Sequence, residues 1–356
     1  MTKLSVIVPT YNEAENLPYL VERVHASLSA YDYELIIVDD NSPDGTGTLA
    51  EELARKRPIK VVHRPGKMGL ATAVIDGFRQ ASGDILGVID ADLQHPPEKI
   101  PELLAAMAKA DIVIASRYVK GGGTRGWTFT REMISRGAKI LPRFLFAKIR
   151  SVKDPLSGFF LFRREVIQDV TLNPVGYKIL LEILVKGKHN GIVEVPYIFG
   201  GRERGRSTFN RKEQINYLKH LWRLIQSEKE AERFVKFCLV GGSGVFVNMG
   251  VYWLLERWGG LRDTFAHPLS VETAILSNFI LNEVWTFRDR REGRVGALLG
   301  RMLRFNLICG VGWALNFMMF YSLTRGFGLY DMAALLIAIL VAMLFNFILN
   351  KWWTWK

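Results

Sequence analysis

The sequence predicts an α/β domain with a mostly parallel sheet, followed by interfacial helices and an all-α transmembrane domain. Two observations predict this organisation. Strand-like apolar runs alternate with helical segments early in the chain, and from Phe234 onward the composition becomes rich in Phe, Leu, Trp and Gly. Continuous Val and Ile runs between helices are typical of a parallel sheet covered on both faces. A chain of 356 residues is long enough for both parts.

Five buried strands and four helices are expected in the first part of this domain. The strand-like runs lie at residues 3–9, 34–39, 59–63, 85–90 and 111–116. The helical segments lie at about residues 14–30, 45–57, 69–82 and 98–109. Sheets of this kind bind their ligands beyond the carboxyl ends of the strands.

Polar residues follow four of the strands at the points where ligands are expected. They are Tyr11-Asn12-Glu13, Asp39-Asp40, Asp90-Ala91-Asp92 and Ser116-Arg117. Since the carboxyl ends of parallel strands meet at one edge of a sheet, these side chains should converge on one rim. This convergence predicts an enzyme and makes a non-enzymatic binding module the least favoured class.

The segment Asp90-Ala91-Asp92-Leu93-Gln94 has the composition of a metal site. It places two carboxylates at i and i+2 and an amide two residues further on, directly after an apolar strand. Mg²⁺ and Mn²⁺ prefer such hard oxygen ligands, and Mg²⁺ keeps several waters and is completed by substrate phosphates. We therefore expect Asp90, Asp92 and Gln94 to ligate Mg²⁺ or Mn²⁺ beside a nucleotide diphosphate. A solvated turn is the alternative.

The charge of the chain indicates an acidic partner, because the net charge is +12. Basic residues flank apolar spans instead of forming a groove interleaved with aromatic residues, which favours an anionic membrane surface over nucleic acid. Cys238 and Cys309 lie in apolar spans and are expected to act as small hydrophobic residues, not as a disulfide or metal site. Residues 1–10 begin directly with a strand pattern, so no signal peptide is expected.

Two amphipathic stretches, at residues 128–149 and 209–232, connect the two parts of the chain. Each has an apolar face opposite a face rich in Lys and Arg. This pattern is typical of helices that lie in a membrane interface. Packing of either helix on the globular core is the alternative.

The last part of the chain contains an internal repeat with an offset of 68 residues. Asn278-Phe279-Ile280-Leu281-Asn282 recurs as Asn346-Phe347-Ile348-Leu349-Asn350, and Phe237 recurs as Phe305. This repeat predicts a duplicated unit of two membrane spans. The four spans are expected at about residues 234–255, 267–287, 303–324 and 332–353, of which the second is the most polar.

Basic residues predict the orientation of these spans. The linker 288–294 is strongly basic and is followed by Arg301 and Arg304. By the positive-inside rule, the linker, both flanks and the first domain should face the cytoplasm. The repeated Gly and Asn residues are expected to serve helix packing, with a transport path as the alternative. The predicted boundaries are residues 1–210, an interfacial helix at 211–232 and a membrane domain at 233–356.

An ordered set of motifs resembles the inverting family 2 glycosyltransferases, which have the Rossmann-like GT-A fold. The motifs are Pro9 to Glu13, Val38 to Thr46, Asp90 to Gln94, Ser116-Arg117-Tyr118, Ile134 to Ala138 and Glu194-Val195-Pro196. Together they are similar to the dolichyl-phosphate mannose synthases over about residues 4–210. This resemblance implies metal-dependent transfer of mannose from GDP-mannose to a polyprenyl phosphate. Residues 233–356 resemble the small four-helix domain that accompanies such transferases.

The resemblance implies roles for individual residues. Contacts with the nucleotide sugar are expected from Pro9, Tyr11, Glu13, Val38, Asp40, Asp90, Ala91 and Arg202. Contacts with the acceptor phosphate are expected from Arg117, Arg131 and Ser135, and the expected catalytic residues are Asp92, Arg117 and Arg131. A role at a helix start is the alternative for Glu13, and attraction of lipid headgroups is the alternative for Arg131.

The nucleophile determines which further groups the reaction needs. A lipid phosphate has a second pKa of about 6, so it is largely an oxyanion at neutral pH. It needs positioning but no general base, so we expect no catalytic histidine and interpret His63 and His95 as structural. The expected partners are GDP-mannose, the polyprenyl phosphate and the bilayer, without nucleic acid and without an obligatory protein partner.

One departure and two rival functions stay open at this point. Ser207-Thr208 stands where family members often carry Ser-Lys, which puts the phosphate contact of that lysine in doubt. Transfer of glucose from UDP-glucose is the rival within the class. Translocation of a glycolipid by the membrane domain is the rival from another class.

Overall fold

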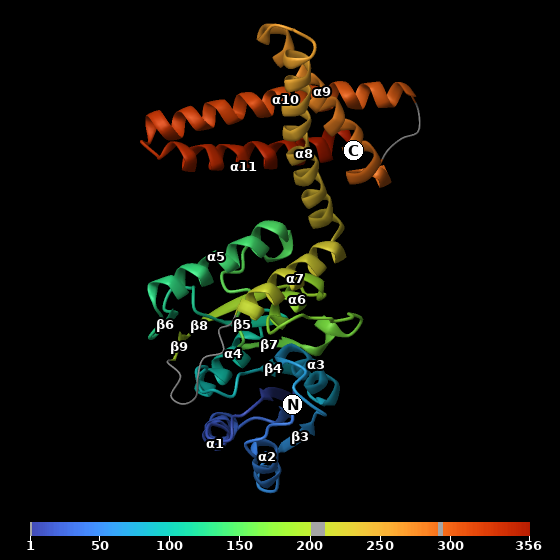
Figure 1. Ribbon diagram of the computed structural model, residues 1–356. Helices are drawn as coiled ribbons and strands as arrows, with labels where there is room; N and C mark the ends of the chain where they lie inside the picture. Colours follow the sequence, from blue (N-terminus) through green and yellow to red (C-terminus); the bar gives the residue numbers. More distant parts are fainter. Residues whose placement is uncertain (1, 201–210, 291–294) are drawn as a thin grey trace. The chain divides into compact units, whose positions relative to one another are not determined.

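The computed structural model describes residues 2–200, 211–290 and 295–356 (Figure 1). The chain divides into two compact units, Met1–Leu224 and Ile225–Lys356. The first unit contains the strands and the second is helical. Each unit is described by itself below.

A seven-stranded sheet forms the centre of the first unit, with the strand order β3-β2-β1-β4-β7-β5-β8. Its strands are β1 (Leu4–Thr10), β2 (Tyr33–Asp39), β3 (Ile59–His63), β4 (Ile85–Val88), β5 (Ile112–Ser116), β7 (Phe160–Arg163) and β8 (Ile192–Pro196). All neighbours are parallel except β7, which runs antiparallel to β4 and β5. The predicted mostly parallel sheet is therefore confirmed. A small second sheet pairs β6 (Gly123–Thr124) with β9 (Ile198–Phe199).

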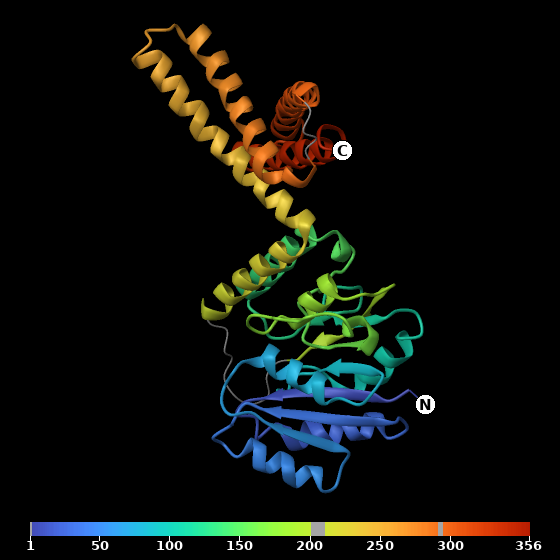
Figure 2. The same cartoon turned by 90° about the vertical axis from the view of Figure 1, so that its right-hand side faces the viewer.

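The helices that connect these strands form where the apolar periodicity predicts them, although each is shorter than predicted. They are α1 (Leu17–Leu28), α2 (Thr46–Ala54), α3 (Leu70–Gln80) and α4 (Ile100–Ala106). A later helix, α6 (Ile179–Lys186), was not predicted. In α1, a proline in the first turn starts the helix, and Leu20 and Val24 turn their side chains into the core against the strands. Figure 2 shows the strands of this unit running side by side between their helices.

The strand order creates a switch point between β1 and β4. From β1 the chain moves outward through β2 to β3, and it then returns to place β4 on the other side of β1. At such a point the connections leave a crevice beyond the carboxyl ends of the two strands, where open α/β sheets bind their ligands. Pro9 and Thr10 end one of these strands, and the segment Asp90 to Gln94 follows the other.

The chain turns sharply where three strands end. Asn12, Asn41 and Leu93 have φ angles of 57°, 57° and 61°, shortly after β1, β2 and β4. Asparagine tolerates this left-handed conformation, whereas leucine rarely adopts it and is strained by on the order of 1–3 kcal/mol. The Leu93 side chain is buried among core residues, and this burial holds the turn.

Two further helices complete the first unit. These are α5 (Phe129–Leu145), which begins at the N-cap Thr128, and α7 (Arg211–Ser227). They contact each other through the Tyr217 hydroxyl, which donates to the carbonyl of Ala138 at 2.6 Å. The helical stretch predicted at 209–232 is not continuous, because Glu228 has an extended backbone and a new helix begins at Lys229.

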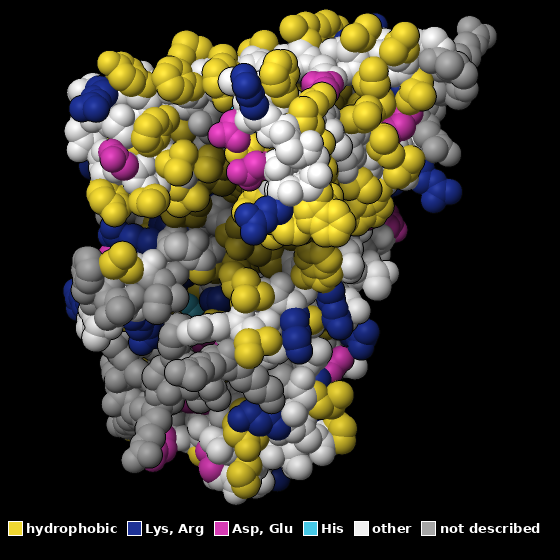
Figure 3. Space-filling model, turned by 45° about the horizontal axis from the view of Figure 1, so that its top comes forward, with side chains coloured by type: hydrophobic (Ala, Val, Ile, Leu, Met, Phe, Trp, Pro, Cys, Tyr) yellow, Lys and Arg dark blue, Asp and Glu magenta, His cyan; other side chains and the backbone are white. Residues whose placement is uncertain are grey.

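The second unit consists of two long helix pairs. Its helices are α8 (Lys229–Arg257), α9 (Asp263–Leu281), α10 (Val295–Tyr321) and α11 (Asp331–Leu349). Among the described helices, three are long and apolar enough to cross a membrane, namely Lys229–Arg257, Gly296–Gly326 and Asp331–Thr354. The second predicted span, on α9, is not one of them, because Glu272, Asn278 and Glu283 lower its hydropathy. Hydrophobic side chains cover much of this unit in Figure 3.

The predicted 68-residue repeat is also a structural repeat. Each pair of helices ends in a π-helical turn, η4 (Asn282–Thr286) after α9 and η7 (Asn350–Thr354) after α11. At both turns an asparagine side chain bonds a carbonyl four residues earlier, Asn282 to Asn278 and Asn350 to Asn346, each at 2.9 Å. The same side-chain chemistry therefore produces the same local backbone in the two halves.

Aromatic rings join the two halves of the repeat. Phe287 and Trp355, which occupy equivalent positions, stack on each other with centroids 4.4 Å apart and ring planes at 7°. Phe279 stacks on Trp355, and its equivalent Phe347 stacks on Phe287. Each cross-contact thus occurs twice, as expected for two copies related by a pseudo-twofold axis.

Charged residues of the two halves also meet. The guanidinium of Arg301 bonds both carboxylate oxygens of buried Glu283, at 2.6 and 3.1 Å, and the Trp355 indole donates to the same carboxylate at 2.7 Å. The equivalent positions hold Arg233 and Lys351, both cationic, and Glu230 lies between them with a contact of 2.5 Å to each.

The close helix contact at Gly312 gives a stability prediction. A Cβ atom at Gly312 would lie 2.7 Å from Cγ of Asn346, whereas at Gly310 it would meet nothing within 4 Å. We expect Gly312→Ala to destabilise the protein by roughly 1–3 kcal/mol, the usual cost of overpacking. Thermal melting in detergent measures this, with Gly310→Ala as the matched control. Equal melting midpoints for the two variants would contradict the contact.

Candidate active site

The predicted donor-side residues lie together at the carboxyl edge of the sheet. Pro9 and Val38 are buried and occupy paired positions on the neighbouring strands β1 and β2. Tyr11 follows β1, and the Lys67 ammonium lies 3.7 Å from the centre of its ring. Three of the four predicted strand ends therefore belong to the adjacent strands β2, β1 and β4, whereas antiparallel β7 separates β5, which precedes Arg117, from β4.

Glu13 combines its predicted position with a structural role. Its carbonyl accepts the Leu17 amide at 2.9 Å, and its carboxylate accepts the Asn16 side chain at 2.7 Å, so it takes part in the turn that opens α1. Its own amide donates to the Thr46 hydroxyl at 2.9 Å, which fixes it to the start of α2. The alternative role at a helix start is thus present in the structure.

Asp40 is held firmly at the end of β2. It is buried, its carboxylate pairs with the guanidinium of Arg64, and it also accepts the Gly69 amide at 3.0 Å. Arg64 in turn forms an ion pair with Asp76 at 3.0 Å and donates to the Thr72 hydroxyl at 2.8 Å. This network connects the loop before α3 to the end of β2.

The segment Asp90 to Gln94 follows β4 and contains the strained residue Leu93. Asp92 accepts the Gln94 amide at 3.2 Å, and Ala91 is buried beside it. The Gln94 side-chain nitrogen donates to the Gly200 carbonyl at 3.0 Å, which leaves its amide oxygen as the atom suited to a cation. Asp90, Asp92 and Gln94 thus offer hard oxygen donors that fit Mg²⁺ or Mn²⁺. Among the described residues, no group of three or more His, Cys, Asp or Glu side chains has metal-binding geometry.

His95 lies beneath this segment as part of the core. It is 2% exposed, and its ring is surrounded by Phe159, Tyr197 and Phe199. Burial, followed by the charges of nearby Arg117 and Lys178, lowers the pKa of His95 to about 3. A neutral, enclosed imidazole supports the Asp90 turn and is unsuited to proton transfer near pH 7.

Arg117 at the end of β5 forms a buried ion pair with Asp154. Two guanidinium nitrogens donate to the two oxygens of this carboxylate, at 2.8 and 2.7 Å, and the Arg117 amide donates to it at 3.0 Å. Burial would raise the pKa of Asp154, but the hydrogen bonds and charge of Arg117 outweigh burial and lower it. Glu194 fixes the same turn by accepting the amides of Lys153 and Asp154 at 2.8 and 2.9 Å.

The other two predicted acceptor residues lie on α5. The Arg131 guanidinium lies 4.5 Å from the centre of the Trp127 ring, and the Ser135 hydroxyl lies 2.7 Å from that of Tyr118. Tyr118 and Trp127 also flank Arg117, whose guanidinium lies 5.4 and 5.6 Å from their ring centres. Shared aromatic neighbours therefore bring the three predicted phosphate contacts into one region.

The structure adds residues that the sequence did not single out. Asp154 stands in Asp-Pro-Leu-Ser-Gly, which reads as an ordinary turn, and only its pairing with Arg117 shows its importance. Lys178, just before α6, is half-buried near Arg117, Asp154 and Asp90. Arg202, predicted to contact the nucleotide sugar, lies outside the described residues, as do Ser207 and Thr208.

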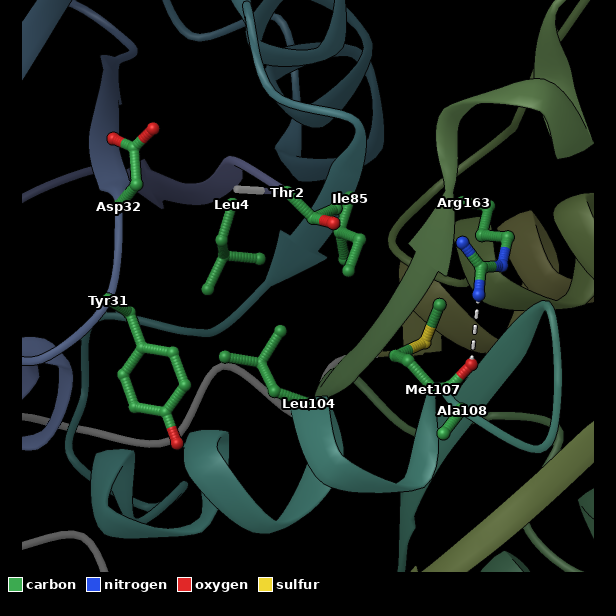
Figure 4. Close-up of a pocket in the computed structure, with 9 residues that line it drawn as sticks. All are labelled: Thr2, Leu4, Tyr31, Asp32, Ile85, Leu104, Met107, Ala108 and Arg163. Atoms are coloured by element: carbon green, nitrogen blue, oxygen red, sulfur yellow. Dashed lines mark hydrogen bonds between the residues drawn. The ribbon is translucent and has the colours of Figure 1, made fainter.

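A cavity of about 260 Å³ lies at the opposite edge of the sheet (Figure 4). It is lined by residues that include Leu4 and Ile85, the first residues of β1 and β4, and Arg163, the last residue of antiparallel β7. The candidate active site lies beyond the other ends of these strands, so this cavity is separate from it.

Comparison with known proteins places both parts of the chain in families. Residues 5–171 match the family Glycosyl transferase family 2, and residues 236–355 match the GtrA/DPMS transmembrane domain. The dolichol-phosphate mannosyltransferase of Pyrococcus furiosus is 46% identical over 354 residues, which are 99% of each chain. The polyprenol monophosphomannose synthase of Mycolicibacterium smegmatis is 41% identical over 211 residues, covering 56% of this chain and 78% of that protein.

Solved structures with a similar backbone were also found. Mannosyl-3-phosphoglycerate synthase from Rubrobacter xylanophilus has a TM-score of 0.49 and 18% identity, over 64% of this chain and 74% of that one. Glucosyl-3-phosphoglycerate synthase from Mycobacterium tuberculosis, in complex with Mn²⁺, uridine diphosphate and glucosyl-3-phosphoglycerate, has a TM-score of 0.47 and 22% identity, over 63% and 79%. The sheet, the ordered motifs and the full-length relative agree. The chain therefore belongs to the dolichol-phosphate mannosyltransferases of glycosyltransferase family 2, and it carries the GtrA/DPMS transmembrane domain.

Proposed function

We propose that the protein transfers mannose from GDP-mannose to the phosphate of a polyprenyl phosphate, with inversion at the anomeric carbon and at the cytoplasmic face of a membrane. The observation that carries this proposal is that Phe199 connects two groups of residues, the Asp-x-Asp-x-Gln segment and the predicted contacts for the acceptor phosphate. Its ring packs on His95, next to Gln94, and lies 5.6 Å from the guanidinium of Arg117. The first group offers oxygen donors for a cation and its diphosphate. The second group offers a guanidinium fork and a hydroxyl for a second phosphate.

The donor side would hold the nucleotide across the switch point. The Asp40–Arg64 network and Tyr11 would line the nucleotide site, and Asp90, Asp92 and Gln94 would hold Mg²⁺ or Mn²⁺ near the diphosphate. A bound cation would offset the negative charge that develops on the departing nucleoside diphosphate. Arg202 follows Gly200, which is bonded to Gln94, and we propose it as a further contact for the diphosphate.

The acceptor side would position a nucleophile that is already ionised. Asp154 fixes the orientation of Arg117 by accepting hydrogen bonds from Nε and Nη2. The Nη1 group would then donate to a phosphate oxygen without reorganisation of the side chain. Arg131 and Ser135 would add a second cation and a hydroxyl from α5. No side chain has to remove a proton, which agrees with a buried, neutral His95. A single in-line displacement on an α-linked donor gives a β-linked product.

The placement of α5 and α7 supports delivery of the acceptor from a membrane surface. Ile140 on α5 is 59% exposed, and Leu218 and Trp222 on α7 are 57% and 49% exposed. Basic residues share these helices, so both helices have the character of interfacial ones. We propose that they lie in the headgroup region, that the second unit spans the bilayer with all four helices, and that the basic segment near Arg290 faces the cytoplasm.

A donor panel tests this function. Detergent-solubilised full-length protein is incubated with farnesyl phosphate, Mg²⁺ or Mn²⁺, and GDP-mannose, UDP-glucose or GDP-glucose. We expect prenyl-phosphate mannose from GDP-mannose alone and no product after chelation with EDTA. Preference for UDP-glucose would overturn the choice of donor, and full activity with the metal removed would overturn the proposed metal role.

A further inference from the structure

Lys178 is a cation inside the candidate active site that none of the matched motifs includes. Its ammonium donates to the Leu156 carbonyl at 3.0 Å, in the same turn that presents Asp154 to Arg117. Burial, followed by the positive charge of Arg117, lowers the pKa of Lys178 to about 7, with Arg131 acting in the same direction and Asp154 and Asp90 opposing. The ammonium therefore lies among the groups of both phosphate-binding sides.

The segment that carries Lys178 is fixed by several elements. The Val175 amide donates to the His220 ring of α7 at 3.1 Å, and the Gly176 carbonyl accepts the Ala71 amide of α3 at 3.3 Å. A Cβ at Gly176, whose φ is +82°, would lie 3.1 Å from Cβ of Asn216 on α7. Lys178 is thus delivered to its position by a rigid connection and is not a mobile surface lysine.

Both cations and carboxylates surround the Lys178 ammonium. Lys178 directly precedes α6, and the amino end of a helix repels positive charge. Arg117 repels it as well, and the Asp154 carboxylate is already occupied by the Arg117 guanidinium. The Asp154 and Asp90 carboxylates attract this ammonium, but Arg117, Arg131 and Lys178 together form a cluster of cations that an added anion would stabilise further.

We propose that Lys178 binds an oxygen of the acceptor phosphate, together with Arg117 and Arg131. This proposal rests on the proposed function, because it concerns the same lipid phosphate. The acceptor side is favoured because the turn that holds the ammonium, through Leu156, is the turn that orients Arg117. Lys178 would supply a point charge that partly replaces the lysine expected where Thr208 stands.

Kinetics of Lys178→Met in the full-length protein test the assignment. The variant keeps the apolar stem and removes the charge, so we expect KM for farnesyl phosphate to rise roughly 10- to 100-fold, as for loss of a hydrogen bond to a charged group. KM for GDP-mannose should change less than about twofold, and Lys178→Arg should recover part of the affinity. A rise in KM for GDP-mannose alone would overturn the assignment, since the cation would then serve the departing diphosphate.

Lys148→Met is the matched control. Its ammonium also donates to a backbone carbonyl, that of Val185 at 2.9 Å, but at the far end of α6 from Lys178. We expect both KM values of this variant to match the wild type. If Lys148→Met and Lys178→Met raise KM for farnesyl phosphate equally, Lys178 has only a structural role.

Two measurements without turnover separate this proposal from the proposed function. Calorimetric titration with farnesyl phosphate should show weaker binding to Lys178→Met even if the donor panel yields no mannosyl product. Ligand-free Lys178→Met should melt at the wild-type midpoint or above it, because a repulsion between cations is removed. A lower midpoint with unchanged binding of farnesyl phosphate would overturn the proposal. If Lys178→Met does not fold, Lys178→Arg is measured in its place. Retained affinity of Lys178→Arg for farnesyl phosphate would then support the proposal, and loss of that affinity would overturn it.

Discussion

Replacement of Asp92 by Ala should reduce mannosyl transfer by roughly 10²- to 10³-fold or more, the range seen when one electrostatic contact to a developing charge is removed. Asp92 is buried, and it directly precedes Leu93, whose backbone is in the left-handed conformation. Its loss would remove a central oxygen donor between Asp90 and Gln94. Transfer measured across a Mn²⁺ titration checks this, and excess metal should not restore the wild-type rate.

A control separates this effect from a loss of folding. Asp169 is an exposed carboxylate whose ion pair with Lys188 lies on the surface, so Asp169→Ala should transfer mannose at the wild-type rate. Circular dichroism of Asp92→Ala should retain the wild-type spectrum. Wild-type transfer by a folded Asp92→Ala protein would refute the assignment of the rim as the metal and diphosphate site.

Replacement of Asp154 by Ala should destabilise the first unit by about 3–5 kcal/mol, because it leaves the buried Arg117 guanidinium without its anion. The side chains of this pair are 0% and 8% exposed, so water cannot compensate for the loss. For a unit of this size each kcal/mol shifts the melting midpoint by roughly 2–4 °C. Differential scanning fluorimetry should therefore show a fall on the order of 10 °C, whereas Asp169→Ala should melt within about 2 °C of the wild type.

The double variant Asp154→Leu with Arg117→Leu distinguishes stability from chemistry. Replacing both members of a buried pair by apolar residues is often neutral for stability, so much of the melting midpoint should return. Transfer should stay lost, because the guanidinium that we assign to the acceptor phosphate is absent. Recovery of both properties would show that Arg117 has no role beyond packing.

The parts of the fold that depend on local pattern could be predicted from the sequence. Val and Ile runs predicted β1 to β5 in outline, except that the run at 85–90 forms a strand only to Val88. β7 was not predicted, because its short apolar run, Phe160–Arg163, has no strand periodicity and its antiparallel pairing with β4 and β5 is a long-range property. The helix α6 was missed for a similar reason, since every residue but its last is buried and it shows no polar face.

The residues of the candidate site also differ in whether local sequence could predict them. Asp90, Asp92 and Gln94 are close in sequence, so their chemistry could be predicted from spacing, and Pro9 and Tyr11 follow a strand end. Asp154 and Lys178 are significant only through contacts with residues distant in sequence. Asp154 and Arg117, for example, are 37 positions apart. Their assigned roles, like those of all the site residues, stay predictions until the variants are measured.

The aromatic and charged contacts between the two repeats have a consequence for how the helices find their partners. A subunit made of two identical halves could exchange a half with a neighbouring molecule, because every surface would fit its own copy. Here Glu283 in one half faces Arg301, while the matching positions hold Lys351 and Arg233. Two second halves joined to each other would place Lys351 against Arg301, cation against cation, without the Glu283 carboxylate. The divergence of the two halves therefore disfavours pairing of a second half with its own kind and favours pairing of one first half with one second half.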